Sequence, residues 1–400
     1  MAKSDVGLIY DAKRLTLLAN NILNGNGFVY DAGIPRASRA PLYPLFLAGM
    51  GKLFGPDHQL VRYAEALINS LLLIVIYQIG KSLCSRSVGL ISAIIYGLSS
   101  ITYFSTVTIL TENLTTFLFF TGFMVIFKND LINSRNKLLF VLGWILIMLS
   151  CLARPNNVAF IPFYVLYLIF RERRIWVKKS VYVICIGLLV LSPWTMRNYK
   201  IYNKIIPITS SGPGNIFIGN YFDVGGRRYD IEKKGLPAPL VSEISGYLKY
   251  DSDEELYEPY VSDFYWKHIK TKLTSHPVDS LMYIVKKMSL AFLPYDDWYD
   301  WYKKLGIDER HFEYFFPLKM LSYKILFLPF VTGIVLALRA KYNALLILYL
   351  ASQIFLIGLV FYDGPRYRII FYPVVAIYAG ILVDFILRKI KLIRRTKEAV

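Results

Sequence analysis

The sequence predicts an all-α polytopic membrane protein with about nine spanning helices, interfacial helices and an extracytoplasmic, α-rich cap. Of its 400 residues, 55% are hydrophobic and only 18% are charged, whereas an ordinary soluble domain has about 25% charged residues. Aromatic residues reach 16%, as expected for a chain with aromatic belts at both membrane surfaces. Apolar runs long enough to cross a bilayer recur along the chain.

The first 58 residues are predicted to form an extracytoplasmic loop with interfacial helices. Residues 11–24 are compatible with a helix that begins at an acid, and a glycine turn and then Arg36 and Arg39 follow. The apolar segment 41–55 is too short and too rich in glycine to span the membrane. We expect it to form an interfacial or re-entrant helix.

Downstream, the apolar runs divide into two groups around a polar insertion. Residues 59–194 hold six predicted spans, and residues 316–400 hold three spans and a basic tail. The segment 195–315 carries 16 Lys and Arg against 17 Asp and Glu, and it is predicted to be a folded extracytoplasmic cap. The predicted spans are 59–80, 88–105, 109–127, 137–153, 156–170, 178–194, 319–338, 342–361 and 369–388.

The distribution of basic residues predicts the orientation. Cytoplasmic loops of membrane proteins are enriched in Lys and Arg. Alternate turns and the C-terminal tail hold eighteen Lys and Arg, whereas the opposite short turns hold only Arg154, Arg366 and Arg368. The cap and the first loop are therefore predicted to lie outside, and a spanning helix is expected ahead of this sequence. The net charge of +18 is attributed mostly to this bias, so no nucleic-acid partner is expected. The basic segments are 81–86, 128–137, 171–179, 339–341 and 388–397.

Within the cap, residues 269–295 mix Lys286 and Lys287 with leucine, isoleucine and valine. This pattern predicts a basic amphipathic helix that lies on the outer leaflet. The pair His276 and Pro277 is expected to end one cap helix and to start another.

Arginines at the predicted outer face suggest an anion site. Charged side chains near hydrocarbon are costly, and a guanidinium group can donate two parallel hydrogen bonds to a phosphate. A lipid-linked phosphate or pyrophosphate fits a site at the membrane surface. Each arginine taken alone could instead be an interfacial anchor. The residues concerned are Arg36, Arg39, Arg154, Arg197, Arg366 and Arg368.

Two carboxylates, Asp11 and Glu112, complement these arginines. A carboxylate in an outer cavity can accept a proton from a hydroxyl or bind a divalent cation. Alternatively, Asp11 could be solvated or a helix cap, and Glu112 could be a buried acid paired with an arginine. The histidines and cysteines are too dispersed to form a metal site. No cofactor is predicted, and the binding of a divalent cation is left as an open alternative.

Several motifs follow one another in a characteristic order: DAKRLTLLANNILNGNGF from Asp11, RAPLYPLFLAG from Arg39, LTENL, ARP, PWTMRNY, SGPGNIFIGN and RYRIIFYP. The set runs from Asp11 to about residue 384 and resembles the GT-C glycosyltransferases of the protein-mannosyltransferase and aminoarabinose-transferase type. The family has a transmembrane helix before its first-loop acid, and Ala12 stands where a second acid is usual.

The resemblance implies an integral membrane enzyme that uses a polyprenyl-phosphate-linked sugar and transfers it outside the cytoplasmic membrane with inversion. The acceptor would be a glycan, lipid or protein, and membrane lipids would surround the chain. Asp11 would be the general base, and Arg39 would lie near the donor phosphate. Arg154, Arg197, Arg366 and Arg368 are further candidates for binding that phosphate. Other polar site candidates are Glu112, Arg36, Asn198, Asn215, Asn220 and Lys287.

Three other classes of protein stay open, and one of them is a non-catalytic membrane scaffold. A lipid-linked oligosaccharide ligase or polymerase would have a similar architecture and use a pyrophosphate donor. A lipid-sugar flippase would place ionisable residues near the midplanes of several spans, whereas the predicted spans are nearly free of central charge.

Overall fold

The protein is described by a computed structural model that covers residues 8, 11–30, 33–55, 57–131, 136–221, 238–247, 258–290, 323–338, 343–360 and 365–398. Every regular element within these residues is a helix, and strand-like pairing is limited to one bridge between Val29 and Pro35. The predicted all-α fold is confirmed. In this described part of the chain, four helical stretches are long and apolar enough to cross a membrane: His58–Leu83, Trp176–Tyr202, Asn343–Val360 and Arg366–Ile393.

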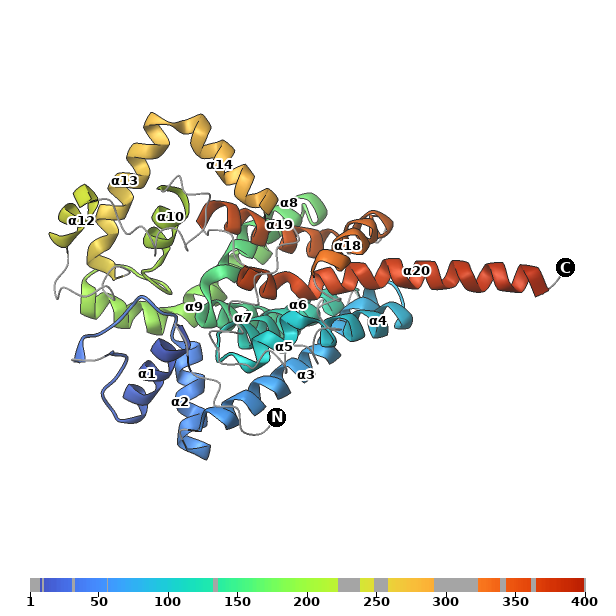
Figure 1. Ribbon diagram of the computed structural model, residues 1–400, viewed down its shortest axis with the longest axis horizontal. Coiled ribbons are helices and arrows are strands. Elements are labelled where there is room, and N and C mark those ends of the chain that lie inside the picture. The colour runs from blue at the N-terminus through green and yellow to red at the C-terminus, as the bar shows by residue number, and fades with distance from the viewer. Residues whose placement is uncertain are drawn as a thin grey trace.

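The first loop is built around two short helices, α1 (Asp11–Leu23) and α2 (Leu42–Phe54), which lie side by side at one end of the molecule (Figure 1). The buried residues of α1 recur every three or four positions, as expected of an amphipathic helix. They pack against α2, and this contact fixes the first turn of α1, where Asp11 lies. The buried residues are Ala12, Leu15 and Ala19 of α1 and Tyr43, Leu47 and Ala48 of α2.

The first group of apolar helices follows the predicted runs, with two differences. The run 88–105 is divided into α4 and α5, because the Ser99 side chain accepts the Thr102 N–H and starts a new helix. The run 156–170 begins with a 3₁₀ turn, η2. The elements are α3 (His58–Leu83), α4 (Arg86–Gly97), α5 (Ser100–Val107), α6 (Glu112–Leu131), α7 (Lys137–Ala153), η2 (Pro155–Ala159), α8 (Phe160–Arg171) and α9 (Trp176–Tyr202).

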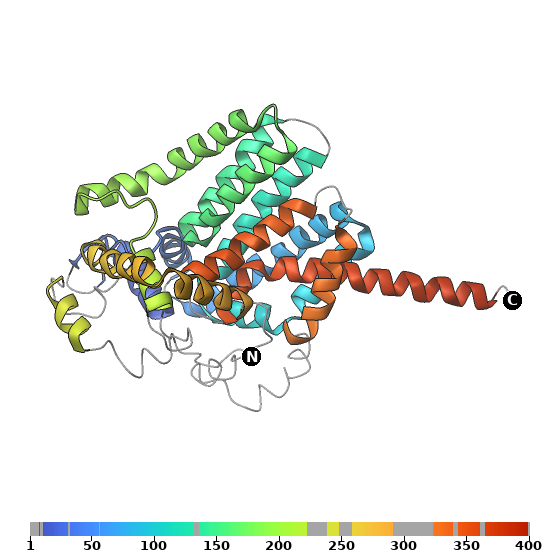
Figure 2. The same cartoon turned by 90° about the horizontal axis from the view of Figure 1, so that it is seen from above.

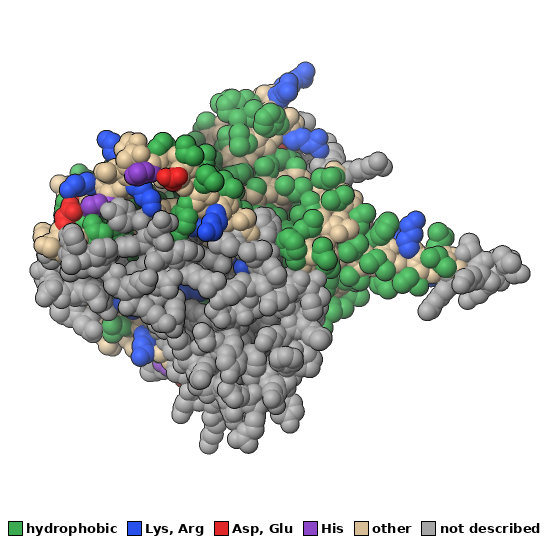
Figure 3. Space-filling view, turned by 45° about the horizontal axis from the view of Figure 1, so that its top comes forward, with side chains coloured by type: hydrophobic (Ala, Val, Ile, Leu, Met, Phe, Trp, Pro, Cys, Tyr) green, Lys and Arg blue, Asp and Glu red, His purple; other side chains and the backbone are tan. Residues whose placement is uncertain are grey.

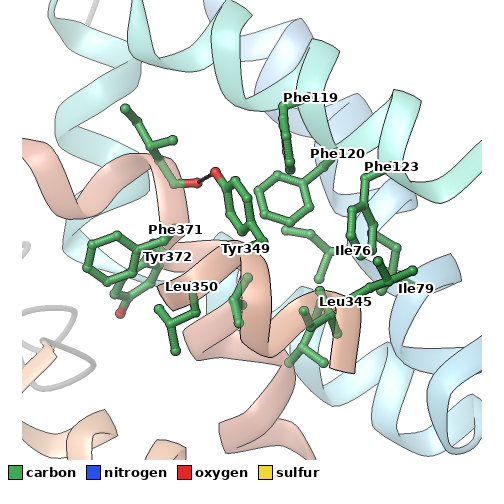
Figure 4. Packing of buried hydrophobic residues seen from close by; sticks show 14 of the residues in the cluster. Ile76, Ile79, Phe119, Phe120, Phe123, Leu345, Tyr349, Leu350, Phe371 and Tyr372 are labelled. Carbon is green, nitrogen blue, oxygen red and sulfur yellow. Dashed lines mark hydrogen bonds between the residues drawn. The ribbon is translucent and has the colours of Figure 1, made fainter. Parts of the chain in front are cut away.

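An aromatic core joins these helices to the C-terminal ones (Figure 4). The rings of Phe119 in α6 and Tyr349 in α19 (Asn343–Val360) stack with their centroids 4.2 Å apart. The buried Tyr349 hydroxyl donates to the Ile370 carbonyl at 3.0 Å. This bond ties α19 to the 3₁₀ segment η5 (Pro365–Phe371), so the core also holds the segment that carries Arg366.

Two of the C-terminal apolar helices pack very closely against each other. Gly333 of α18 (Tyr323–Ala337) lies against the backbone of Tyr378 in α20 (Tyr372–Glu398). A Cβ atom at Gly333 would collide with the Tyr378 carbonyl. The C-terminal half of α20 projects beyond the bundle as a continuous helix (Figures 1 and 2), so the basic tail is helical in the described residues.

The cap contains α10 (Gly212–Tyr221), α12 (Ala238–Ser245), α13 (Ser262–Ser275) and α14 (Pro277–Leu290). Helices α13 and α14 form an arch (Figure 1). The helix is interrupted at His276 and Pro277, as predicted. The expectation of one amphipathic helix over 269–295 is therefore wrong. Residues 291–295 lie outside the described residues. The exposed apolar residues of α14 are Val278, Leu281, Met282 and Val285.

Exposed leucine, isoleucine and phenylalanine side chains cover much of the bundle, as expected of a surface that meets lipid. In Figure 3 hydrophobic side chains dominate the visible bundle, and the visible acidic and histidine side chains lie toward the end away from α20. With the long apolar helices, this surface identifies a membrane protein.

Candidate functional site

Five charged side chains from separate parts of the chain form one ionic network. Arg39 donates to Asp11 at 2.7 Å, and Arg366 donates to the other oxygen of the same carboxylate at 2.6 Å. Arg366 also donates to Glu112, which accepts a bond from Arg154 at 2.8 Å. The sequence singled out all five residues, and the structure brings them together.

Four of these side chains lie at the ends of helical elements. Asp11 starts α1 and Glu112 starts α6, where a helix dipole favours negative charge. Arg154 follows the last residue of α7, and Arg366 lies in the first turn of η5. The four helix ends lie close together, so the network forms where these helices begin or end.

The network is buried at Glu112 and more open at Asp11. The side chain of Glu112 is 0% exposed, whereas those of Asp11 and Arg39 are 24% and 25% exposed. Within these five described side chains, three guanidinium groups accompany two carboxylates, so the five together carry one net positive charge. A partly open site with this charge is suited to a singly charged anion.

The inner arginine, Arg154, is held from several sides. It donates to the Thr111 hydroxyl and to the Asn156 side chain, each at 3.2 Å. Its guanidinium group also lies 5.5 Å from the centre of the Tyr367 ring. Arg154 therefore has little freedom to turn, and it fixes the buried Glu112 carboxylate.

A third acid lies nearby that the sequence reading missed. Glu65 of α3 is 0% exposed and accepts a hydrogen bond from the Tyr43 hydroxyl at 2.6 Å. A single acid inside an apolar span is costly and usually has a role, so its position in the 59–80 run was the available signal.

Arg197 belongs to a different cluster, between the first loop and α9. It donates to the Arg36 carbonyl at 2.6 Å and to the Asn198 side chain at 2.9 Å. Its guanidinium group lies 4.7 Å from the centre of the Trp194 ring and 5.6 Å from that of Phe28. These contacts fasten the first loop to α9, and the structure does not join Arg197 to the Asp11 network.

Asn220 and Lys287 form a third cluster, between the cap and α19. The Lys287 ammonium group donates to the Gly219 carbonyl at 2.9 Å and to the Asn220 side chain at 2.8 Å. Asn220 in turn donates to the Leu359 carbonyl. Burial, together with the positive charge of nearby Lys272, lowers the pKa of Lys287 to about 7. The cluster is structurally separate from the ionic network.

The remaining candidates are less informative. Asn215 lies in the first turn of α10, and its backbone N–H donates to the Ser211 carbonyl at 3.0 Å. Arg368 lies two residues beyond Arg366 in η5 and is only 1% exposed. Among the described residues, no group of three or more His, Cys, Asp and Glu side chains is arranged to hold a metal ion.

Comparisons with known proteins agree with this fold. Residues 38–196 match the model of the family described as dolichyl-phosphate-mannose-protein mannosyltransferase. The chain has a TM-score of 0.56 to the archaeal oligosaccharyltransferase AglB from Archaeoglobus fulgidus, solved with an inhibitory peptide and a dolichol-phosphate. The identity is 14%, over 97% of this chain and 47% of that one.

Two further structures are similar. The apo form of the Archaeoglobus fulgidus oligosaccharyltransferase gives a TM-score of 0.55 at 14% identity, over 97% of this chain and 48% of that one. ArnT from Cupriavidus metallidurans bound to undecaprenyl phosphate gives 0.42 at 10% identity, over 94% and 73%. No curated protein sequence matches significantly.

The chain therefore has the fold of the GT-C superfamily, and the resemblance expected from its motifs is confirmed. The chain spans about half the length of the oligosaccharyltransferases that it resembles.

Proposed function

We propose that the chain is an integral membrane glycosyltransferase acting at the outer face of the cytoplasmic membrane. It moves a sugar from a polyprenyl-phosphate donor to a hydroxyl or phosphate of a glycan, lipid or protein, with inversion. The observation that carries this proposal is the ionic network, in which Asp11 shares a partly exposed site with Arg39 and Arg366.

Asp11 is the general base of the proposed reaction. Its carboxylate accepts the proton of the acceptor hydroxyl while the acceptor oxygen forms a bond to the anomeric carbon. The bond between that carbon and the donor phosphate oxygen breaks, and the phosphate leaves with the electron pair. Attack from the side opposite the leaving group accounts for inversion.

Arg39 and Arg366 bind the donor phosphate, and Arg154 holds the inner side of the network. A phosphate diester carries one negative charge, which equals the excess positive charge of the five side chains. Guanidinium groups match phosphate geometry and stabilise the charge that develops on the leaving group. Because both outer arginines bond to Asp11 in the free protein, a phosphate that takes their N–H groups releases Asp11 to act as a base.

A flippase is a less suitable function for these helices. A path across the membrane needs ionisable groups near the midplanes of spans. Helix α19 contains no charged residue, and α7 carries only the lysine at its first position. The charges that the proposed reaction needs are instead gathered at helix ends.

The proposal is tested with the purified protein in vesicles. Donors with the same labelled sugar linked through one phosphate or through two are supplied with glycan, lipid and protein fractions of the cell envelope. We expect label to leave the monophosphate donor and to appear in one fraction. Transfer from the diphosphate donor alone would identify an oligosaccharide ligase or polymerase, and movement of donor across the vesicle without transfer would identify a flippase.

A further inference from the structure

A short piece of the first loop, residues 35–38, is bound almost entirely by distant parts of the chain. We call it the strap. Its carbonyl oxygens and one of its N–H groups pair with side chains and backbone from residues 197–210 and from Glu258. The bonds are Tyr202 hydroxyl to Pro35 carbonyl at 2.6 Å, Arg197 to Arg36 carbonyl at 2.6 Å, Ala37 N–H to Glu258 at 3.0 Å, Ser210 N–H to Ala37 carbonyl at 2.9 Å and Thr209 hydroxyl to Ser38 carbonyl at 2.7 Å.

Glu258 is the acid among these partners and the one that lies in the cap beyond α10. It lies just before the 3₁₀ turn η4 (Pro259–Val261) and is 1% exposed. The Arg36 guanidinium group lies 3.9 Å from the Glu258 carboxylate. Burial raises the pKa of Glu258. A bond from a buried N–H to a carboxylate is stronger than one to a neutral acceptor, and losing it leaves the N–H without a partner.

The strap ends one residue before Arg39. Consecutive Cα atoms are about 3.8 Å apart, so a fixed Ser38 carbonyl also fixes the point from which the Arg39 side chain starts. That side chain then reaches Asp11 at 2.7 Å. Movement of the strap would shift Arg39 relative to Asp11, although Glu258 is not itself part of the ionic network.

We propose that Glu258 is a positioning residue that holds the strap and thereby places Arg39 to bind the donor phosphate. This proposal rests on the proposed function. Glu258 acts through the backbone at Ala37 and leaves the chemistry to Asp11. It couples the cap to the site, so the way in which the cap is seated on the first loop sets the affinity for the donor.

The test compares three variants of the full-length protein: Glu258→Ala, Glu258→Gln and, as a control, Glu243→Ala. Glu243 is an acid of the same cap that pairs with Lys267 and His268 and has no bond to the strap. Hydrogen exchange is followed in peptides covering residues 33–40, and affinity is measured for a polyprenyl phosphate in detergent, without any transfer reaction.

We expect Glu258→Ala to speed exchange at residues 33–40 and to weaken binding about tenfold, because a buried charge-assisted bond is lost. Glu258→Gln keeps an oxygen for the Ala37 N–H, so it should restore most of the protection and binding. Glu243→Ala should resemble the unchanged protein. The same protection in Glu258→Ala, or faster exchange with unchanged binding, would overturn the positioning role.

Failure of the proposed function gives a different result. If the unchanged protein does not bind polyprenyl phosphate, the proposed donor is wrong. The role of Glu258 in positioning Arg39 for that donor is then rejected too, whatever the exchange rates are. If the unchanged protein and Glu258→Ala bind polyprenyl phosphate equally well, the proposed donor is supported and only the role of Glu258 is rejected.

Discussion

Asp11 and Arg366 are separated by 355 positions in the sequence, and their side chains meet at 2.6 Å. This pair joins α1 to η5, the 3₁₀ segment that leads into α20. Because Arg366 also bonds to Glu112, a single guanidinium group connects the exposed part of the network with its buried part.

Replacing Asp11 with Asn should abolish transfer while leaving lipid binding largely intact. The amide keeps the size of the side chain and loses the proton-accepting charge, so the rate should fall by about 10²- to 10⁴-fold. Initial rates of sugar transfer and the affinity for polyprenyl phosphate are the measurements. Asp57→Asn is the control, because Asp57 caps α3 and asparagine caps equally well. An active Asp11→Asn protein would refute the assignment.

Replacing Glu112 with Gln should strongly destabilise the protein. It removes one charge of a buried cluster and leaves Arg154 and Arg366 facing a neutral group, which typically costs about 3–5 kcal/mol. Thermal unfolding in detergent measures the loss. The matched control, Glu172→Gln, breaks a more exposed pair with Lys179 at 2.8 Å, and it should cost no more than about 1 kcal/mol. Equal losses in the two variants would contradict the burial argument.

Replacing Gly333 with Ala should also lower the unfolding temperature. The added methyl group meets the Tyr378 carbonyl in the adjacent helix, and forcing such a contact typically costs about 1–3 kcal/mol. Gly49→Ala is the comparison, since a Cβ atom at Gly49 in α2 has no neighbour within 4 Å. That variant should be neutral or slightly more stable, because alanine favours a helix more than glycine does.

The buried Lys287 makes stability depend on pH. Its pKa falls from 10.5 to about 7 on burial, so between these values the folded protein binds fewer protons than the unfolded one. Stability should therefore rise with pH across this window. Lys287→Met should flatten that rise, whereas the exposed Lys270→Met should leave it unchanged. Unfolding temperatures between pH 6 and about 9 test this, and parallel curves for all three proteins would show that Lys287 is not the cause.

The apolar runs and the ordered motifs were enough to predict the helical fold and the five members of the ionic network. Length and hydropathy are properties of a local segment, and the motifs mark the ends of those segments. The division of 88–105 was missed because it depends on a single capping serine, Ser99. A serine within an otherwise continuous apolar run gives no sign in the sequence that it starts a new helix.

Other features depend on contacts between distant segments. In the sequence Glu258 ends the acidic run DSDEELYE, which is typical of a solvated surface, yet this glutamate is buried against the first loop. Arg197 was grouped with the outer arginines for its place at the end of a span. Its partners are carbonyl groups of residues 28 and 36, and only the folded chain shows that pairing.

The meeting of Asp11 with Arg366 also orders events during synthesis. Asp11 leaves the ribosome well before its second arginine, because Arg366 is made 355 positions later. The strap likewise lacks its partners until residues 197–210 and Glu258 have been made. A nascent chain that stops before η5 can pair Asp11 with Arg39 and Glu112 with Arg154, but nothing links the two pairs. The network is thus completed only once η5 has been made, and a chain that ends before η5 lacks it.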